Sequence, residues 1–195
     1  MKLTSICVYC GSNTGAAPSY REAAQAMGRT LAEQNIRLVY GGGQVGLMGV
    51  LADACVDAGG QVTGVIPDFL HQKEIAHPRV PDMRIVSSMH ERKLMMAEES
   101  EAFIAMPGGL GTMEELFEVW TWSQLGRHEK PVGVLNVEGY YDGLLSFLDT
   151  MRGEGFVEQK HRDMLKVGAT PEAVIDALEA YEFPGTIATL SRAQT

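Results

Sequence analysis

Short apolar runs rich in β-branched and aromatic residues alternate with longer stretches of helical period along most of this chain. The runs that predict strands are residues 6–9, 37–40, 62–66, 83–86, 102–105 and 131–137. Most of them are continuously apolar, which is typical of a parallel sheet that is covered on both faces. The alternation therefore predicts an α/β fold of the Rossmann-like class, a doubly wound parallel sheet.

The stretches between the predicted strands have the spacing of amphipathic helices. The predicted helices begin at Pro18, near Leu47, near Met89, after Thr112, near Leu144 and at Pro171. A length of 195 residues fits one such domain, and no repeat, linker or low-complexity segment divides it. We expect a single nucleotide-binding α/β domain over residues 1–183 and a flexible tail over residues 184–195.

The charge and the first residues exclude several classes of protein. A net charge of −9 argues against a nucleic-acid binder, which needs a basic face. The N-terminal residues run straight into a predicted strand, with no charged and apolar leader and no apolar run of membrane-spanning length. We therefore expect a cytoplasmic protein that binds neither nucleic acid nor a membrane.

The cysteines and histidines predict no metal site. Cys7 and Cys10 form a C-x-x-C pair, but they lie in a predicted strand and no second Cys or His pair completes a zinc site. The five histidines lack the spacing of metal ligands. Buried strand cysteines in a reducing compartment are the favoured interpretation.

Three glycine-rich turns each follow a predicted strand: residues 10–15, 41–46 and 107–112. Glycine lets a backbone approach a ligand closely, and the N–H groups of the next helix favour an anion. Because ligands bind at the carboxyl ends of parallel strands, we expect the three turns to meet at one edge of the sheet and to form a phosphate site.

The middle turn leaves an alternative open. Gly41, Gly43 and Gly46 fit G-x-G-x-x-G, and Asp68 lies about 20 residues further on, as in dinucleotide-binding proteins. An oxidoreductase that uses NAD or FAD is one alternative function, and a non-catalytic nucleotide sensor is another. Glycines that serve only a tight turn and helix–sheet packing explain the pattern equally well.

The third turn runs into a possible capping box. Thr112 and Glu115 match T-x-x-E, which predicts that Thr112 caps the following helix. Arg92 and Lys93 lie near the start of the preceding helix, where cations oppose the helix dipole. Two cations, a phosphate-binding turn and a carboxylate are the parts needed for chemistry on a sugar phosphate.

Taken in order, the segments Tyr40–Gly49, Met89–Lys93 and Pro107–Glu115 resemble the Lonely Guy (LOG) family of cytokinin-activating phosphoribohydrolases. The resemblance runs from Ile6 to about Leu178. It implies hydrolysis of the N-glycosidic bond of cytokinin riboside 5′-monophosphates and AMP, which gives free base and ribose 5-phosphate. It also implies a homodimer with sites near the subunit interface, and no cofactor. Members are often labelled lysine decarboxylases, but none of the six lysines here stands out as a Schiff-base lysine.

The resemblance also implies the site residues. Arg92 and Glu115 are the expected catalytic pair. The expected substrate-binding residues are Glu74, Arg92, Lys93, Gly109, Leu110, Gly111, Thr112, Met113, Glu114, Glu115 and Thr121. Three others are expected to contact the nucleotide or to support residues that do: Ser12, Gly43 and Met48.

Overall fold

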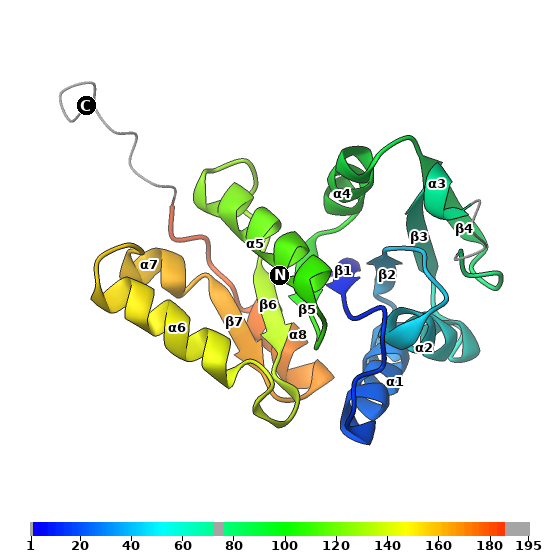
Figure 1. Ribbon diagram of the computed structural model, residues 1–195, viewed down its shortest axis with the longest axis horizontal. Helices are drawn as coiled ribbons and strands as arrows, with labels where there is room; N and C mark the ends of the chain where they lie inside the picture. Colours follow the sequence, from blue (N-terminus) through cyan, green and yellow to red (C-terminus); the bar gives the residue numbers. More distant parts are fainter. Residues whose placement is uncertain (1, 72–75, 186–195) are drawn as a thin grey trace.

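The computed structural model describes residues 2–71 and 76–185, which contain one seven-stranded parallel sheet with helices on both faces (Figure 1). The strands are β1 (Ser5–Tyr9), β2 (Arg37–Tyr40), β3 (Val62–Pro67), β4 (Asp82–Val86), β5 (Ala102–Ala105), β6 (Val132–Leu135) and β7 (Leu165–Gly168). Their order across the sheet is β4-β3-β2-β1-β5-β6-β7. The predicted doubly wound α/β fold is confirmed.

The helices divide between the two faces of the sheet. They are α1 (Pro18–Glu33), α2 (Gly46–Asp57), α3 (Asp68–His71), α4 (Met89–Glu98), α5 (Leu110–Gln124), α6 (Asp142–Gly153), α7 (Gln159–Arg162) and α8 (Pro171–Glu179), with a 3-10 turn, η1 (Val137–Gly139). Helices α1, α2 and α8 pack on one face, and α4, α5 and α6 pack on the other. No helix in the described part of the chain is both long enough and apolar enough to cross a bilayer.

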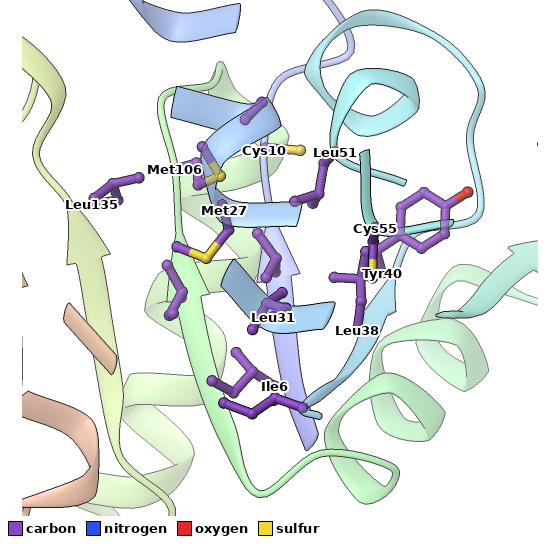
Figure 2. Close-up of a cluster of buried hydrophobic side chains, with 14 of the residues drawn as sticks. Ile6, Cys10, Met27, Leu31, Leu38, Tyr40, Leu51, Cys55, Met106 and Leu135 are labelled. Atoms are coloured by element: carbon purple, nitrogen blue, oxygen red, sulfur yellow. The ribbon is translucent and has the colours of Figure 1, made fainter. Parts of the chain in front are cut away.

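The central strand β1 contributes to both cores because its side chains alternate between the two faces. Ile6 lies in the cluster that also contains Met27 and Leu31 of α1 (Figure 2). Cys7 and Tyr9 point into the opposite cluster, under α4 and α5. Ile6, Met27 and Leu31 are fully buried, so truncating any of them to alanine should cost about 2–5 kcal/mol of stability.

Four elements were not predicted: β7, α3, α7 and the 3-10 turn η1. Strand β7 lies at the edge of the sheet, where Lys166 is half-buried and Val167 is 42% exposed, so it lacks the continuous apolar run of the inner strands. The predicted strand over residues 131–137 ends earlier, at Leu135. Asn136, with φ −88° and ψ 74°, leaves strand geometry, and the 3-10 turn begins at Val137.

The predicted capping box of α5 is wrong. Helix α5 begins at Leu110, its N-cap is Gly109, and no side chain caps it. Thr112 is instead buried in the first turn, and its hydroxyl lies close over Gly108, where a Cβ would come within 2.1 Å of it. The two glycines allow the helix to start earlier, so its first N–H groups stay uncapped and Glu115 is free for other contacts.

Side chains do cap the N-terminus of α4. The Ser88 hydroxyl accepts from the Glu91 N–H at 3.2 Å, and the Glu91 carboxylate accepts from the N–H of Ser87 at 2.7 Å. Because Glu91 supplies negative charge in the first turn, it offsets the unfavourable position of Arg92 and Lys93 in the turn that follows.

Candidate active site

The three glycine-rich turns meet where the sheet order reverses, with β1 between β2 and β5. The N–H of Gly11 donates to the Pro107 carbonyl at 3.1 Å, and the N–H of Leu47 donates to the Gly11 carbonyl at 2.9 Å. The prediction that these turns share one edge is therefore confirmed. This reversal is the place where open α/β sheets bind ligands.

Two adjoining cavities open between these turns. The first, called here the Glu115 cavity, has a volume of about 250 Å³ and is lined by Cys10, Ser12, Met48, Arg92, Gly109, Leu110, Gly111, Thr112 and Glu115. The second, the Tyr140 cavity, has about 280 Å³ and is lined by Gly11, Ser12, Asn13, Thr14, Gly15, Tyr20, Leu47, Pro107, Gly108, Gly109 and Tyr140. They share Ser12 and Gly109. The combined volume of the two cavities falls within the range of roughly 300–1,000 Å³ that is typical of small-molecule sites.

Arg92 reaches the Glu115 cavity from the second turn of α4. Its Nε donates to the Val65 carbonyl at 3.1 Å, and one terminal nitrogen donates to the Gly41 carbonyl at 3.3 Å. A Cβ at Gly41 would lie 1.8 Å from that nitrogen, so a side chain at this position would displace the guanidinium. The other terminal nitrogen is 3.4 Å from a carboxylate oxygen of Glu115.

Glu115 faces Arg92 from the second turn of α5. Its side chain is only 12% exposed, and burial raises the pKa of its carboxyl. The charge of Arg92 lowers this pKa again but does not cancel the effect of burial. A carboxyl group in this state can exchange a proton closer to neutral pH than an exposed glutamate can.

Lys93 is not among the described residues that line the Glu115 cavity. Its ammonium group makes ion pairs with Glu114 and, at 3.0 Å, with Glu118, both on α5. Burial lowers the pKa of Lys93, but its hydrogen bonds to the two carboxylates outweigh this and raise the pKa overall. Lys93 therefore links α4 to α5 through ion pairs.

The other predicted site residues fall into three groups. Ser12, Met48, Gly109, Leu110, Gly111 and Thr112 line the Glu115 cavity. Four residues are not among the described residues that line either cavity: Gly43, Met113, Glu114 and Thr121. Gly43 is buried in a backbone bridge to Ala76, and Thr121 is exposed further along α5. Glu74 lies outside the described residues.

Sequence reasoning missed the aromatic wall of the Tyr140 cavity. Tyr20 and Tyr140 pack edge to face with ring centroids 5.5 Å apart, and the Tyr20 ring lies over Gly15, where a Cβ would come within 2.6 Å of it. The glycine-rich turn at 10–15 indicated a site here. Nothing in the local sequence around Tyr140 indicated that it would reach the same turn.

Two of the three glycines of the G-x-G-x-x-G pattern, Gly41 and Gly46, are explained by contacts within the protein. Gly41 makes room for Arg92, and a Cβ on Gly46 would lie 2.2 Å from the backbone of Ser12. Asp68 is exposed at the start of α3. These contacts favour the packing interpretation of the pattern over a pyrophosphate site.

Cys7 and Cys10 are buried free thiols, as is Cys55, which confirms that the C-x-x-C pair is buried. Cys7 lies in β1 as predicted, but Cys10 follows the strand, which ends at Tyr9. Burial raises the pKa of each thiol, which keeps all three in the unreactive form. Across residues 2–71 and 76–185, no group of three or more His, Cys, Asp or Glu side chains is placed to hold a metal ion.

Residues 48–178 match a family model described as "Possible lysine decarboxylase". The cytokinin riboside 5′-monophosphate phosphoribohydrolase LOG3 of Arabidopsis thaliana is 49% identical over 180 residues, which cover 92% of this chain and 84% of that protein. The probable cytokinin riboside 5′-monophosphate phosphoribohydrolase LOGL6 of Oryza sativa subsp. japonica is 50% identical, over 90% of this chain and 70% of that protein.

Solved structures share the fold at lower identity. The molybdenum cofactor binding protein of Rippkaea orientalis superposes with a TM-score of 0.69 at 22% identity, over 92% of this chain and 98% of that chain. The molybdenum cofactor carrier protein of Chlamydomonas reinhardtii gives a TM-score of 0.65 at 19% identity, over 90% and 95%. These two likenesses bear on the fold alone.

Proposed function

The chain belongs to the LOG family of cytokinin riboside 5′-monophosphate phosphoribohydrolases, and from this membership we propose the reaction, the residues that perform it and the form in which the enzyme works. The chain is a hydrolase of N-glycosyl bonds. It cleaves cytokinin riboside 5′-monophosphates to the free base and ribose 5-phosphate. AMP is a second proposed substrate, because it carries the same ribose 5-phosphate on a plain adenine.

One observation carries the assignment of the site: the buried pair of Arg92 and Glu115 lies in a cavity beside the uncapped N-terminus of α5. The cavity thus combines a group that can stabilise positive charge with backbone donors suited to a phosphate. A nucleoside 5′-monophosphate needs both, at the two ends of its ribose.

The 5′-phosphate binds at the N-terminus of α5. The first N–H groups of the helix, at Leu110, Gly111 and Thr112, have no side-chain cap, and all three residues line the cavity. A doubly charged phosphate there gains from the helix dipole and fixes the ribose before reaction.

Glu115 acts on the bond between C1′ and the base. As this bond breaks, positive charge of the oxocarbenium type builds on the ribose, and a nearby carboxylate stabilises it or activates the attacking water. Arg92 orients Glu115 and binds ribose or phosphate oxygens, since two backbone carbonyls already hold its guanidinium in place. The site residues on the chain perform these steps without a cofactor.

We place the enzyme in the cytoplasm, as a homodimer with the site near the subunit interface. Apolar side chains on both helices of the catalytic pair support such an interface, because Met89 of α4 is 37% exposed and Leu110 of α5 is 91% exposed. Sedimentation of the purified chain gives its oligomeric state, and a monomer would contradict the proposal.

The reaction is tested by chromatography. Purified protein incubated with AMP or isopentenyladenosine monophosphate should release free base, whereas the unphosphorylated nucleosides should be much poorer substrates. A nucleotide sensor would bind AMP and leave it intact. An oxidoreductase would be stabilised against heat by NAD(P) or a flavin instead.

A further inference from the structure

Two consecutive tyrosines between β6 and α6 hold the turn between β5 and α5. The Tyr141 hydroxyl donates to the Met106 carbonyl and the Tyr140 hydroxyl donates to the Gly108 carbonyl, each at 2.6 Å. Tyr141 is fully buried, whereas Tyr140 is 42% exposed and lines its cavity. The loop between β6 and α6 thus holds the carbonyls of Met106 and Gly108 in the turn that leads to the phosphate site.

The loop that carries the tyrosines is itself held firmly. The Asn136 side chain accepts from the N–H of Tyr141 at 2.7 Å. Glu138 has a φ of 49°, which is uncommon for a residue with a side chain, and its carboxylate accepts from the Ser19 hydroxyl at 2.9 Å. The surrounding contacts therefore determine where the Tyr140 hydroxyl lies.

The carbonyl that Tyr140 holds belongs to the peptide unit between Gly108 and Gly109. In a trans peptide the C=O and the N–H point in opposite directions, so the N–H of Gly109 points away from the Tyr140 hydroxyl. Gly109 is the N-cap residue of α5 and lines both cavities. Within the described residues, no backbone carbonyl accepts from this N–H.

A peptide unit between two glycines can rotate at small energetic cost, because neither residue has a Cβ to restrict it. Rotation here would replace the N–H with a carbonyl oxygen at the entrance to the phosphate site. An oxygen in that position would repel the anion that the N–H attracts.

We propose that Tyr140 is a positioning residue for the 5′-phosphate, because its hydroxyl locks the Gly108–Gly109 peptide with the N–H turned toward the ligand. The inference rests on the proposed function. Tyr140 acts through the peptide and takes no part in the chemical step at C1′. Its hydroxyl therefore affects the binding of phosphorylated ligands and leaves the reactivity of the bound substrate unchanged.

The variant Tyr140→Phe keeps the ring and removes the hydrogen bond. We expect the KM for AMP to rise about tenfold, as for the loss of one hydrogen bond to a charged group, with kcat within about twofold of the wild type. The much slower hydrolysis of adenosine, which has no phosphate, should not change. Tyr181→Phe removes a tyrosine hydroxyl just after α8, on a residue that is not among those lining either cavity, and serves as the matched control.

Three outcomes overturn the proposal: an unchanged KM for AMP, an equal loss of activity on AMP and adenosine, or a fall in kcat alone. The binding of ribose 5-phosphate, measured by calorimetry, distinguishes a failure of the Tyr140 proposal from a failure of the proposed function. If the wild type hydrolyses no nucleotide, the function is wrong, and the positioning role then depends on binding alone. About tenfold weaker binding of ribose 5-phosphate to Tyr140→Phe supports it, and equal binding or no binding to either protein overturns it.

Discussion

Arg92 of α4 and Glu115 of α5 form an ion pair at 3.4 Å, with side chains only 11% and 12% exposed. Arg92 is also held by two backbone carbonyls, whereas the pKa of Glu115 remains raised by burial despite the neighbouring charge. The backbone thus holds Arg92 in one orientation, while burial moves the pKa of Glu115 upward from the ordinary value for glutamate. The predictions for the reaction follow from this division.

The variant Glu115→Gln should lose turnover of AMP by about 10²–10⁴-fold, because the amide neither carries charge nor accepts a proton. Its melting temperature should stay the same or rise, since the neutral amide avoids the desolvation that raises the pKa of the carboxyl. Release of adenine measured by chromatography, together with a thermal melt, checks both parts.

Glu98→Gln is the matched control for this change. Glu98 is exposed on α4 and lines neither cavity. The variant should hydrolyse AMP like the wild type. Full activity in Glu115→Gln would show that the catalytic carboxylate has been assigned to the wrong residue.

The pH profile of kcat/KM should fall on the acidic side with a midpoint above 4.5, the ordinary value for glutamate, because the reaction needs the ionised form of a carboxyl whose pKa is raised. The folded protein binds this proton more tightly than the unfolded chain. Stability from Glu115 is therefore greatest at low pH and is lost as the pH rises through the raised pKa. The melting temperature of the wild type should therefore fall relative to that of Glu115→Gln as the pH rises through this pKa, and thermal melts over this pH range measure the difference.

Removal of the charge at Arg92 should move the acidic limb of the profile to higher pH. The charge of Arg92 is the largest effect that lowers the pKa of Glu115. In Arg92→Gln this effect is lost, so burial should raise the pKa of Glu115 further. We also expect kcat to fall, because the amide cannot orient the carboxylate as the guanidinium does. A limb that stays in place or moves to lower pH would mean that the two groups are not coupled in solution.

The fold could be predicted where the burial of a segment leaves a clear apolar pattern in the sequence. Apolar runs, most of them continuous, identified six strands, including the edge strand β4. The other edge strand, β7, carries Lys166 and an exposed Val167 in a run of only four residues, and was not recognised. The capping box at Thr112 and Glu115 failed for a related reason. The local sequence matched, but two glycines before it allowed α5 to begin at Leu110.

The site could be predicted where chemistry and spacing coincide and not where it depends on tertiary contacts. Arg92 and Glu115 could be singled out because each lies in a segment that resembles a LOG-family motif, and the structure brings the two side chains within 3.4 Å of each other. The contact of Tyr140 with Gly108 joins two separate loops, and no local pattern encodes it. The orientation of Lys93 toward α5 likewise depends on how two helices pack.

The change Gly41→Ala should reduce activity by at least about tenfold, because a Cβ at this position would lie 1.8 Å from a terminal nitrogen of Arg92. The fold should persist, since the clash falls on the end of a flexible side chain. Gly143→Ala is the control: no atom lies within 4 Å of the added Cβ, and alanine in α6 should stabilise by up to about 1 kcal/mol. Equal activity in the two variants would contradict the close packing of Gly41 against Arg92.

Replacement of Lys93 by methionine separates a structural role from a direct role in binding phosphate. In the structure the ammonium is paired with Glu114 and Glu118, so Lys93→Met breaks the ionic contact between α4 and α5 and leaves two carboxylates without their partner. Loss of these charged hydrogen bonds should cost about 2 kcal/mol, or roughly 4–8 °C in melting temperature for a chain of this size. The KM for AMP should change less than threefold, because the paired charge is not directed into the Glu115 cavity. The matched control is Lys2→Met. Lys2 is exposed before β1, so this variant tests the loss of one positive charge alone. A rise of tenfold or more in KM with an unchanged melting temperature would instead show that Lys93 leaves its carboxylates and binds the phosphate when substrate is present.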